Sequence, residues 1–354
     1  MLKNFWYACE FSTAVTNQPK QIRMLNQRFV LYRNSQGQVI ALKDQCPHRG
    51  AALSLGWVED GCIRCPYHGW KFQADGRCID IPANVPETPI PQKARVETYP
   101  AQEKYGFVWL FYGDLPEAER PPIPPLPEFE NPTLHPIFLE VKFNTHYTRV
   151  IENALDPAHM STVHANSFGY GFTQDPRVEN YKVQNEDWGI SAKIKYANFT
   201  KPKGIFRFFF RPARTEVNAK TSFYLPNITK VESNFGRGKM VNYAIHLPID
   251  NNTTISKRIQ FRSGLTYRWA DILFLKFHYK VCQEDRVVSE SQYPKTVPDS
   301  LSAEIHTSAD ALPLAYRKLR QKYLKMSWGL EPSESKSDNS NGNSVQPASV
   351  ALLN

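Results

Sequence analysis

The chain has 354 residues, of which 41% are hydrophobic and 22% charged, and its formal net charge is +9. This length and composition indicate a globular protein of about two domains, large enough to bury metal sites in its core. No apolar run reaches the roughly eighteen residues of a membrane-spanning helix, and the basic residues are dispersed rather than gathered in one patch. A transmembrane segment and nucleic-acid binding are therefore not expected.

The six cysteines, at positions 9, 46, 62, 65, 78 and 282, bear on the compartment of the protein. Residues 1–10 lack the apolar core of a secretory signal peptide. In a long chain without such a signal, cysteines are better explained as metal ligands or free thiols than as disulfides. We expect a reducing, cytoplasmic environment.

The first predicted domain is all-β and covers residues 1–114. Short alternating segments recur within residues 29–112, for example residues 29–32 and 107–111, each followed by a turn that contains glycine. Alternation with a period of two between such turns is typical of strands. A linker is predicted next, at residues 115–132, because this segment is rich in proline and each proline removes a backbone donor that a sheet would need.

The second predicted domain, residues 133–328, is α+β. Strand-like alternation begins at Val141, and a helical pattern covers residues 147–164. Further strands are predicted at residues 190–195, 205–210, 239–247 and 254–261, and further helices at residues 267–291 and 309–325. The last segment, residues 329–354, is predicted to be a disordered tail, because most of it has too few apolar side chains to offset the entropy of ordering it.

Two short loops in the first domain each carry one cysteine and one histidine, Cys46-Pro47-His48 and Cys65-Pro66-Tyr67-His68. Two thiolates and two imidazoles suit either a tetrahedral zinc ion or a 2Fe-2S cluster in which two histidines replace two cysteines on one iron. Zinc fingers usually take their cysteines from one pair and their histidines from another. The mixed loops favour the cluster, because each loop can give its cysteine to one iron and its histidine to the other.

With sixteen residues between His48 and Cys65, these loops resemble the Rieske motif. The resemblance implies that Cys46, His48, Cys65 and His68 bind a 2Fe-2S cluster. Rieske proteins of respiratory complexes usually carry an additional cysteine in each loop, and neither loop has one here. The cluster is therefore expected to be of the low-potential type that ferredoxins and oxygenases use.

The second domain contains a pair of histidines, His159 and His164, with carboxylates nearby. Two histidines and one carboxylate form the facial triad that leaves open positions on Fe(II) for O2. Residues five apart on a regular helix point about 140° from each other, so the pair can share a metal only if the helix is distorted between them. From the residues alone, two unrelated polar positions on a helix are an equally valid interpretation.

The pattern Asn153-x-x-Asp156-x-x-His159-x-x-x-x-His164 is similar to the mononuclear-iron motif of Rieske oxygenases. The resemblance implies that His159 and His164 bind iron and that Asn153 lies close to it. It also implies that Asp156 bridges an iron histidine to a cluster histidine of the neighbouring subunit, which gives a short route for electrons.

The third iron ligand is expected from a later acidic segment that contains Glu284, Asp285 and Glu290. A charged face on a helix is normally solvated. This segment nevertheless resembles one in the C-terminal domain of vanillate-demethylase-like and dicamba-monooxygenase-like proteins, where an aspartate binds the iron. The resemblance implies that Asp285 is the ligand, in preference to the two glutamates.

The resemblance covers residues 1 to about 325 and implies the oxygenase component of a Rieske non-haem iron oxygenase. Such a component uses O2 and electrons to hydroxylate or demethylate an organic, aromatic or cyclic substrate, and it assembles as a homotrimer. The sequence has no Gly-x-Gly-x-x-Gly nucleotide loop, so NAD(P)H is expected to act through a separate flavin reductase or ferredoxin. An acidic donor of this kind would suit the net charge of +9.

Three alternatives stay open at this stage. The chain also resembles pigment oxygenases that act on chlorophyll derivatives, although it lacks the C-terminal Cys-x-x-Cys pair of many of them. An electron-transfer Rieske protein without oxygenase activity and a zinc-binding interaction module are the other two. The aromatic residues 205–211 are consistent either with a substrate pocket or with core packing.

Overall fold

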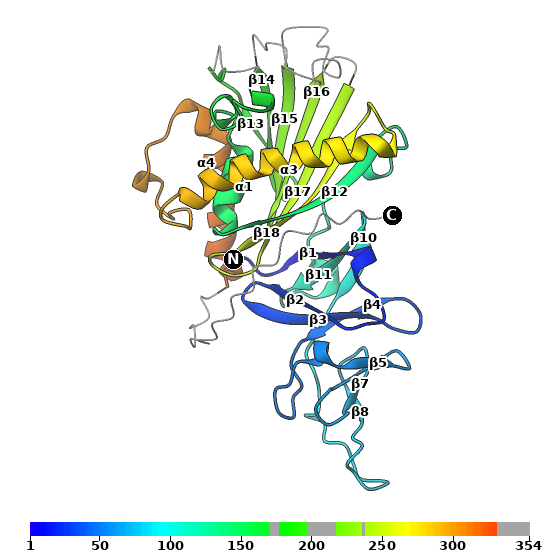
Figure 1. The fold of residues 1–354 in the computed structure, drawn as a ribbon. Helices are drawn as coiled ribbons and strands as arrows, with labels where there is room; N and C mark the ends of the chain where they lie inside the picture. Colours follow the sequence, from blue (N-terminus) through cyan, green and yellow to red (C-terminus); the bar gives the residue numbers. More distant parts are fainter. Residues whose placement is uncertain (170–176, 197–216, 236–237, 331–354) are drawn as a thin grey trace. The chain divides into compact units, whose positions relative to one another are not determined.

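The computed structural model describes residues 1–169, 177–196, 217–235 and 238–330 (Figure 1). The chain divides into two compact units, one formed by Lys3–Ile123 and the other by Met1–Leu2 together with the described residues from Pro124 onward. The division falls inside the proline-rich segment 115–132. Among the described residues, every helix is too short or too polar to cross a lipid bilayer.

The first unit consists of three small antiparallel sheets. Their strand orders are β1-β11-β10, β2-β3-β4-β9 and β5-β6-β7-β8. The strands are β1 (Phe5–Phe11), β2 (Lys20–Met24), β3 (Gln27–Arg33), β4 (Val39–Lys43), β5 (Trp57–Glu59), β6 (Cys62–Arg64), β7 (Lys71–Phe72), β8 (Cys78–Asp80), β9 (Thr98–Tyr99), β10 (Ala101–Lys104) and β11 (Phe107–Tyr112). The all-β prediction for this part of the chain is thereby confirmed.

The second unit is built on one seven-stranded antiparallel sheet of order β12-β18-β17-β16-β15-β14-β13. The strands are β12 (His135–Phe143), β13 (Val183–Glu186), β14 (Gly189–Tyr196), β15 (Val217–Tyr224), β16 (Ile228–Phe235), β17 (Gly238–Pro248) and β18 (Thr254–Arg262). The helices are α1 (Tyr147–Leu155), α3 (Arg268–Ser291) and α4 (Ala311–Tyr323). An antiparallel sheet with a few helices confirms the α+β prediction.

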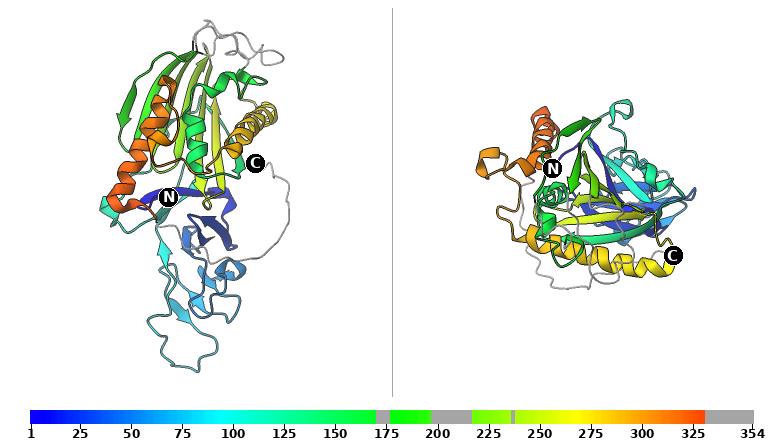
Figure 2. Two further views of the ribbon diagram at one scale, coloured as in Figure 1. Left: turned by 90° about the vertical axis from the view of Figure 1, so that its left-hand side faces the viewer. Right: turned by 90° about the horizontal axis from the view of Figure 1, so that it is seen from above.

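Helix α3 lies across the sheet, and the right-hand view of Figure 2 shows it alongside β12 (Figures 1 and 2). In β12 alternate side chains are buried, as expected for a strand with one face in the core. These side chains pack against α3 in one apolar cluster, which includes Ile137, Leu139, Val141, Phe143, Phe274, Leu275 and Cys282. The packing fixes which face of α3 is turned toward the sheet.

The predicted strands and helices of the second unit agree with the structure at most places. The strands expected at residues 190–195, 239–247 and 254–261 lie within β14, β17 and β18, and α3 and α4 lie within the two later predicted helices. The strand expected from Val141 is the end of β12. Three strands, β13, β15 and β16, were not predicted. The predicted strand at residues 205–210 and the predicted tail after residue 330 lie outside the described residues.

The helix predicted at residues 147–164 is wrong beyond Leu155. Helix α1 ends there, and Asp156 has an extended backbone with φ −79° and ψ 119°. The cause is Pro157, whose ring disfavours the helical conformation of the residue before it and which has no N–H to continue the hydrogen-bond ladder. The chain then forms a 3₁₀ turn at His159–Ser161.

Candidate metal centres and cavity

The two Cys-His loops of the first unit have the same backbone conformation. In each, a glycine four residues after the cysteine has a positive φ, 75° at Gly50 and 72° at Gly69, a conformation that costs glycine little. The glycine N–H donates to the cysteine carbonyl, at 2.9 Å for Cys46 and 3.0 Å for Cys65. The loops therefore present their side chains as two similar halves of one site.

The cysteines of these loops lie inside the unit and the histidines lie outside. Cys46 and Cys65 are buried within the apolar cluster of the domain. His48 and His68 are exposed, and their ring centroids are 4.7 Å apart. Trp70 stacks on the ring of His48, with an interplanar angle of 6°. Two inward thiols and two outward imidazoles fit a 2Fe-2S cluster that receives two sulfurs on its inner iron and two nitrogens on its outer iron.

The pKa values of Cys46 and His48 are both shifted toward the uncharged side chain when no metal is bound. Burial, and then the hydrogen bond and charge of Cys65, raise the pKa of Cys46 to about 11. The thiol is thus protonated until a metal displaces the proton. Desolvation, and then the charge of His68, lower the pKa of His48, which favours the neutral imidazole that a metal ligand requires.

In the second unit the structure brings His159, His164 and Asp285 together, with one ligand atom of each within 4.8 Å of the others. The Nε2 of His164 lies 3.1 Å from Oδ1 of Asp285, and the Nε2 of His159 lies 3.6 Å from the same oxygen. The break in the helix after Leu155 makes this possible, because the two histidines stand in successive turns rather than on one regular helix. The donor set suits Fe(II) with open coordination positions.

In each histidine, the ring nitrogen that points away from Asp285 makes a hydrogen bond. The Nδ1–H of His159 donates to the backbone carbonyl of Asp156 at 2.6 Å, and the Nδ1–H of His164 donates to the carboxylate of Glu284 at 2.8 Å. Both Nε2 atoms are therefore free to face a metal with fixed tautomers. The sequence predicted Glu284 only as a possible ligand and not this supporting contact with His164, although its position next to Asp285 was a signal for it.

Asp285 is ionised in this setting. Burial opposes its charge, but the hydrogen bond from His164 and the charges of the two histidines outweigh burial and hold the pKa of Asp285 at about 2. Asn153 also donates its side-chain amide to Oδ1 of Asp285 at 2.8 Å. Burial lowers the pKa of His159, which favours its neutral form.

Asp156 stands at the edge of this group. Its Oδ1 accepts a hydrogen bond from the N–H of Ala158 at 2.7 Å, and its Oδ2 lies 4.0 Å from Nδ1 of His159. The side chain is 30% exposed. The carboxylate is therefore partly accessible, and Asp156 also lines the cavity described below.

A cavity of about 400 Å³ opens beside the three clustered residues. Its walls come from α1, from α3 and from the turns that carry the two histidines, and its floor comes from β15, β16, β17 and β18. The lining is mixed, with Val231, Met240 and Val281 beside Asn242, Arg258 and Gln260. A cavity of this size and mixture is typical of a site for a small organic molecule.

Comparison with known families and proteins agrees with this description. Residues 5–100 match the Rieske [2Fe-2S] domain, and residues 143–326 match the vanillate O-demethylase oxygenase C-terminal domain. The chain is 31% identical over 258 residues to 4beta-methylsterol monooxygenase of Methylococcus capsulatus, which covers 72% of this chain and 67% of that protein. It is 36% identical over 179 residues to the chloroplastic chlorophyllide a oxygenase of Chlamydomonas reinhardtii, which covers 48% of this chain but only 26% of that protein.

A third relative and one solved structure match over most of the chain. Methylxanthine N1-demethylase NdmA of Pseudomonas putida is 26% identical over 341 residues, which covers 90% of this chain and 88% of that protein. The crystal structure of dicamba monooxygenase bound to dicamba has the same fold, with a TM-score of 0.79 over 92% of this chain and 98% of that chain, at 20% identity. The two matched domains, in this order and over most of the sequence, show that the chain belongs to the Rieske non-haem iron oxygenases as an oxygenase component.

Proposed function

We propose that this chain uses O2 and electrons from a separate NAD(P)H-dependent reductase or ferredoxin to hydroxylate or demethylate an aromatic or other cyclic compound. The observation that carries the proposal is the cluster of His159, His164 and Asp285, whose ligand atoms lie within 4.8 Å of one another at the side of the cavity. A substrate in the cavity would meet a metal held by these residues directly.

We assign the metal ligands accordingly. Cys46, His48, Cys65 and His68 would hold the 2Fe-2S cluster, and His159, His164 and Asp285 would hold Fe(II). When bound, the cluster delivers electrons one at a time and Fe(II) offers open positions for O2. The pair of inward thiols and outward imidazoles supports the first assignment, and the fixed histidine tautomers support the second.

The protein residues around the iron would orient its ligands and the substrate. Asn153 would hold the carboxylate of Asp285 through a hydrogen bond, and Glu284 would hold His164. The cavity would exclude water and limit the approach of the substrate to one side. No step of this proposal requires a protein side chain to form a covalent bond with the substrate.

We propose that Asp156 is the bridge for electrons between subunits and that the oxygenase is a ring of three. A head-to-tail ring would let each subunit present its cluster histidines to Asp156 of the next. The partly exposed carboxylate of Asp156, close to His159, supports this role. Light scattering of the purified protein should give a trimer, and a fully active monomer would contradict the ring.

The substrate class is inferred from relatives. The names of similar proteins specify methylxanthine, a 4beta-methylsterol and 3-chlorobenzoate, all of which are cyclic. A chlorophyll derivative is a second candidate, favoured by the 36% identity to chlorophyllide a oxygenase. Turnover assays with both kinds of compound would decide between them. We place the reaction in the cytoplasm, where the cysteines stay reduced.

Metal analysis and spectroscopy test the proposal directly. The purified protein should be red-brown and contain about three iron atoms per chain, two in the cluster and one mononuclear. His159→Ala should keep the visible spectrum and lose product formation, because the two centres lie in separate units. A colourless, zinc-loaded, folded protein would exclude the 2Fe-2S cluster. Loss of the visible spectrum in His159→Ala would show that the cluster and the mononuclear iron site are not independent of each other.

A further inference from the structure

Four large apolar side chains at the start of α3 are exposed within seven residues of the chain. Tyr267 and Trp269 are 66% and 61% exposed, and their rings stack with an interplanar angle of 9°. Ile272 and Leu273 are 48% and 42% exposed. They stand three and four residues after Trp269, so these three side chains adjoin on one face of the helix. We call Tyr267, Trp269, Ile272 and Leu273 the α3 patch.

The α3 patch lies on the side of α3 that is turned away from the sheet. The opposite side packs with β12 in the core, through Ala270, Phe274, Leu275 and Cys282. The right-hand view of Figure 2 shows α3 along the edge of the second unit. The sheet is therefore covered without help from the α3 patch. Single exposed apolar side chains are common on proteins, whereas a contiguous group of them marks a surface that binds a partner.

The exposed charges around the α3 patch are all positive. Between residues 263 and 280 the exposed charged side chains are those of Arg268, Lys276 and Lys280. The segment contains one acid, Asp271, which is partly buried and pairs with Arg262 and His135. Among the described residues, neither Arg268 nor Lys276 forms an ion pair. The partner of the α3 patch should therefore combine apolar groups with negative charge.

A lipid surface fits this combination better than a second protein surface. Protein interfaces are depleted in lysine at their centres, and two copies of this chain paired about a two-fold axis would bring Arg268 and Lys276 against their own equivalents. At a bilayer, by contrast, Trp and Tyr rings lie at the level of the headgroups, and the stems of Lys and Arg reach from the apolar layer to the phosphates. A helix with such side chains lies in the plane of the interface, with its apolar side chains about 5–10 Å deep.

We propose that α3 binds the surface of a lipid bilayer that contains anionic lipids. The α3 patch enters the boundary between headgroups and acyl chains, and Arg268 and Lys276 pair with the phosphates. The cytoplasmic leaflet of a cell membrane carries anionic lipids, which agrees with a reaction in the cytoplasm. Lipid binding by α3 is separate from the proposed oxygenase function and does not depend on it.

Flotation of the full-length, metal-loaded protein with vesicles tests the proposal. One set of vesicles is phosphatidylcholine alone, and the other is phosphatidylcholine mixed with phosphatidylglycerol. The protein should bind the mixed vesicles about tenfold or more tightly than the neutral ones, because each cation near an anionic surface contributes about 1 kcal/mol. Added salt should weaken the binding to the mixed vesicles, since the cations are exposed.

Two double variants separate the apolar contribution from the charge. Trp269→Ser with Leu273→Ser, the apolar variant, should bind mixed vesicles about tenfold or more weakly, because two large side chains no longer enter the lipid. Arg268→Gln with Lys276→Gln, the charge variant, should bind mixed vesicles about 30-fold more weakly and neutral vesicles almost as before. All four side chains are exposed, so both variants should fold.

Two matched controls change the same kinds of side chain elsewhere. Val287→Ser removes an exposed apolar side chain from α3 outside the α3 patch, and Lys318→Gln removes an exposed cation from α4. Both should bind mixed vesicles like the unchanged protein. Circular dichroism and thermal unfolding report whether each variant is folded.

Three results would overturn lipid binding by the α3 patch. The first is equal binding to the two sets of vesicles, and the second is binding that survives in both double variants. The third is a smaller oligomer in the double variants by light scattering, which would place the α3 patch between copies of this chain. Turnover of a water-soluble substrate without vesicles is a separate measurement, and the double variants should keep it. A protein that binds vesicles through the α3 patch but oxygenates no compound would support lipid binding and remove the oxygenase function.

Discussion

At the scale of single residues, the proposed iron ligands lie in a chain of contacts with Asp285 at its centre. Asn153 donates its side-chain amide to Oδ1 of Asp285, and Nε2 of His164 lies 3.1 Å from the same oxygen. Glu284 accepts from Nδ1–H on the opposite side of His164. Ser167 donates to the same carboxylate of Glu284 at 2.7 Å. These hydrogen bonds hold the side chains in place before a metal binds, which reduces the conformational entropy lost when the site forms.

Glu284→Gln tests the contact behind His164. The change replaces the carboxylate by a neutral amide, which weakens the hold on the imidazole and lowers its basicity. Loss of such a supporting contact typically lowers metal affinity about 10–100-fold. Competition with an Fe(II) chelator measures this affinity. Glu290→Gln is the matched control, because Glu290 accepts from the backbone N–H of Asn144 and does not contact either histidine. Equal affinities in the two variants would contradict the role of Glu284.

Asp156→Asn tests the proposed bridge. Both metals should stay bound, because Asp156 is not assigned as a ligand, but oxidation of the reduced cluster by O2 and substrate should slow strongly. Stopped-flow absorbance of the cluster measures that rate. Asp187→Asn, an exposed change in the turn between β13 and β14, should leave the rate unaltered. Rapid oxidation in Asp156→Asn would refute the bridge.

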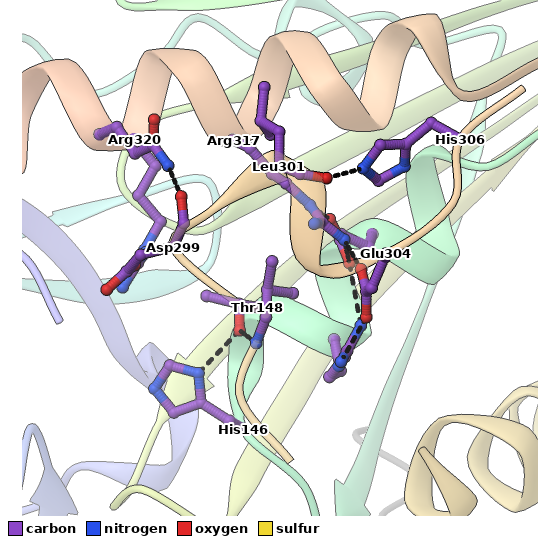
Figure 3. A network of polar contacts seen from close by, with 12 residues as sticks. His146, Thr148, Asp299, Leu301, Glu304, His306, Arg317 and Arg320 are labelled. Atoms are coloured by element: carbon purple, nitrogen blue, oxygen red, sulfur yellow. Dashed lines mark hydrogen bonds and ion pairs between the residues drawn. The ribbon is translucent and has the colours of Figure 1, made fainter. Parts of the chain in front are cut away.

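At the scale of secondary-structure elements, α1 is held in place by a buried network of ion pairs. Arg317 of α4 pairs with Glu304 from the segment between α3 and α4 (Figure 3). Arg317 also pairs with Glu152 of α1, and Arg149 of α1 pairs with Glu304 at 2.9 Å. Helix α1 carries Asn153 and leads directly into the turn of His159. The network thus holds the start of the turn that carries His159, a proposed iron ligand.

Arg317→Met should destabilise the second unit by about 3–5 kcal/mol, because it leaves the carboxylates of Glu152 and Glu304 with Arg149 as the cation that they share. Denaturant unfolding followed by fluorescence measures the change. Arg286→Met removes a partly exposed partner of Glu290, with a separation of 3.8 Å, and should cost less than about 1 kcal/mol. Adding Glu152→Leu to Arg317→Met should restore part of the stability. A similar small cost for both single variants would mean that the network does not stabilise α1.

At the scale of the whole molecule, the formal net charge of +9 is expected to influence the approach of an electron donor. A positive surface attracts an acidic donor over long distances and raises the rate of encounter. Added salt screens exposed charges over about 10 Å at 0.1 M, whereas buried ligands are little affected. The association rate of the donor and the oxygenase is therefore expected to fall as salt is added.

Stopped-flow reduction of the cluster by an acidic ferredoxin should slow as the salt concentration rises. The association rate should fall far more than the rate of the chemical step. Reduction by a small uncharged photoreductant should be nearly independent of salt. If the ferredoxin rate were also independent of salt, the positive charge would serve another purpose and an acidic donor would be excluded.

The sequence by itself was sufficient for the two domain types, because their motifs are local. The two Cys-His loops lie within 23 residues, from Cys46 to His68, and a glycine with positive φ shapes each one. His159 and His164 are also close in the chain. Pro157 carried the information that the helix ends, since a proline restricts the residue before it, but the apolar periodicity of the segment obscured this signal.

Only the tertiary structure decided how distant residues meet. Three acidic side chains of α3 were candidates for one role, and the packing of α3 on β12 gives them different contacts. Asp285 lies beside Nε2 of both histidines, Glu284 accepts from Nδ1 of His164, and Glu290 accepts from Asn144. The cavity depends on the pairing of β15 to β18, which places Arg258 opposite Ala244. Strand pairing and helix rotation are set by contacts between segments far apart in the chain, and local periodicity does not contain that information.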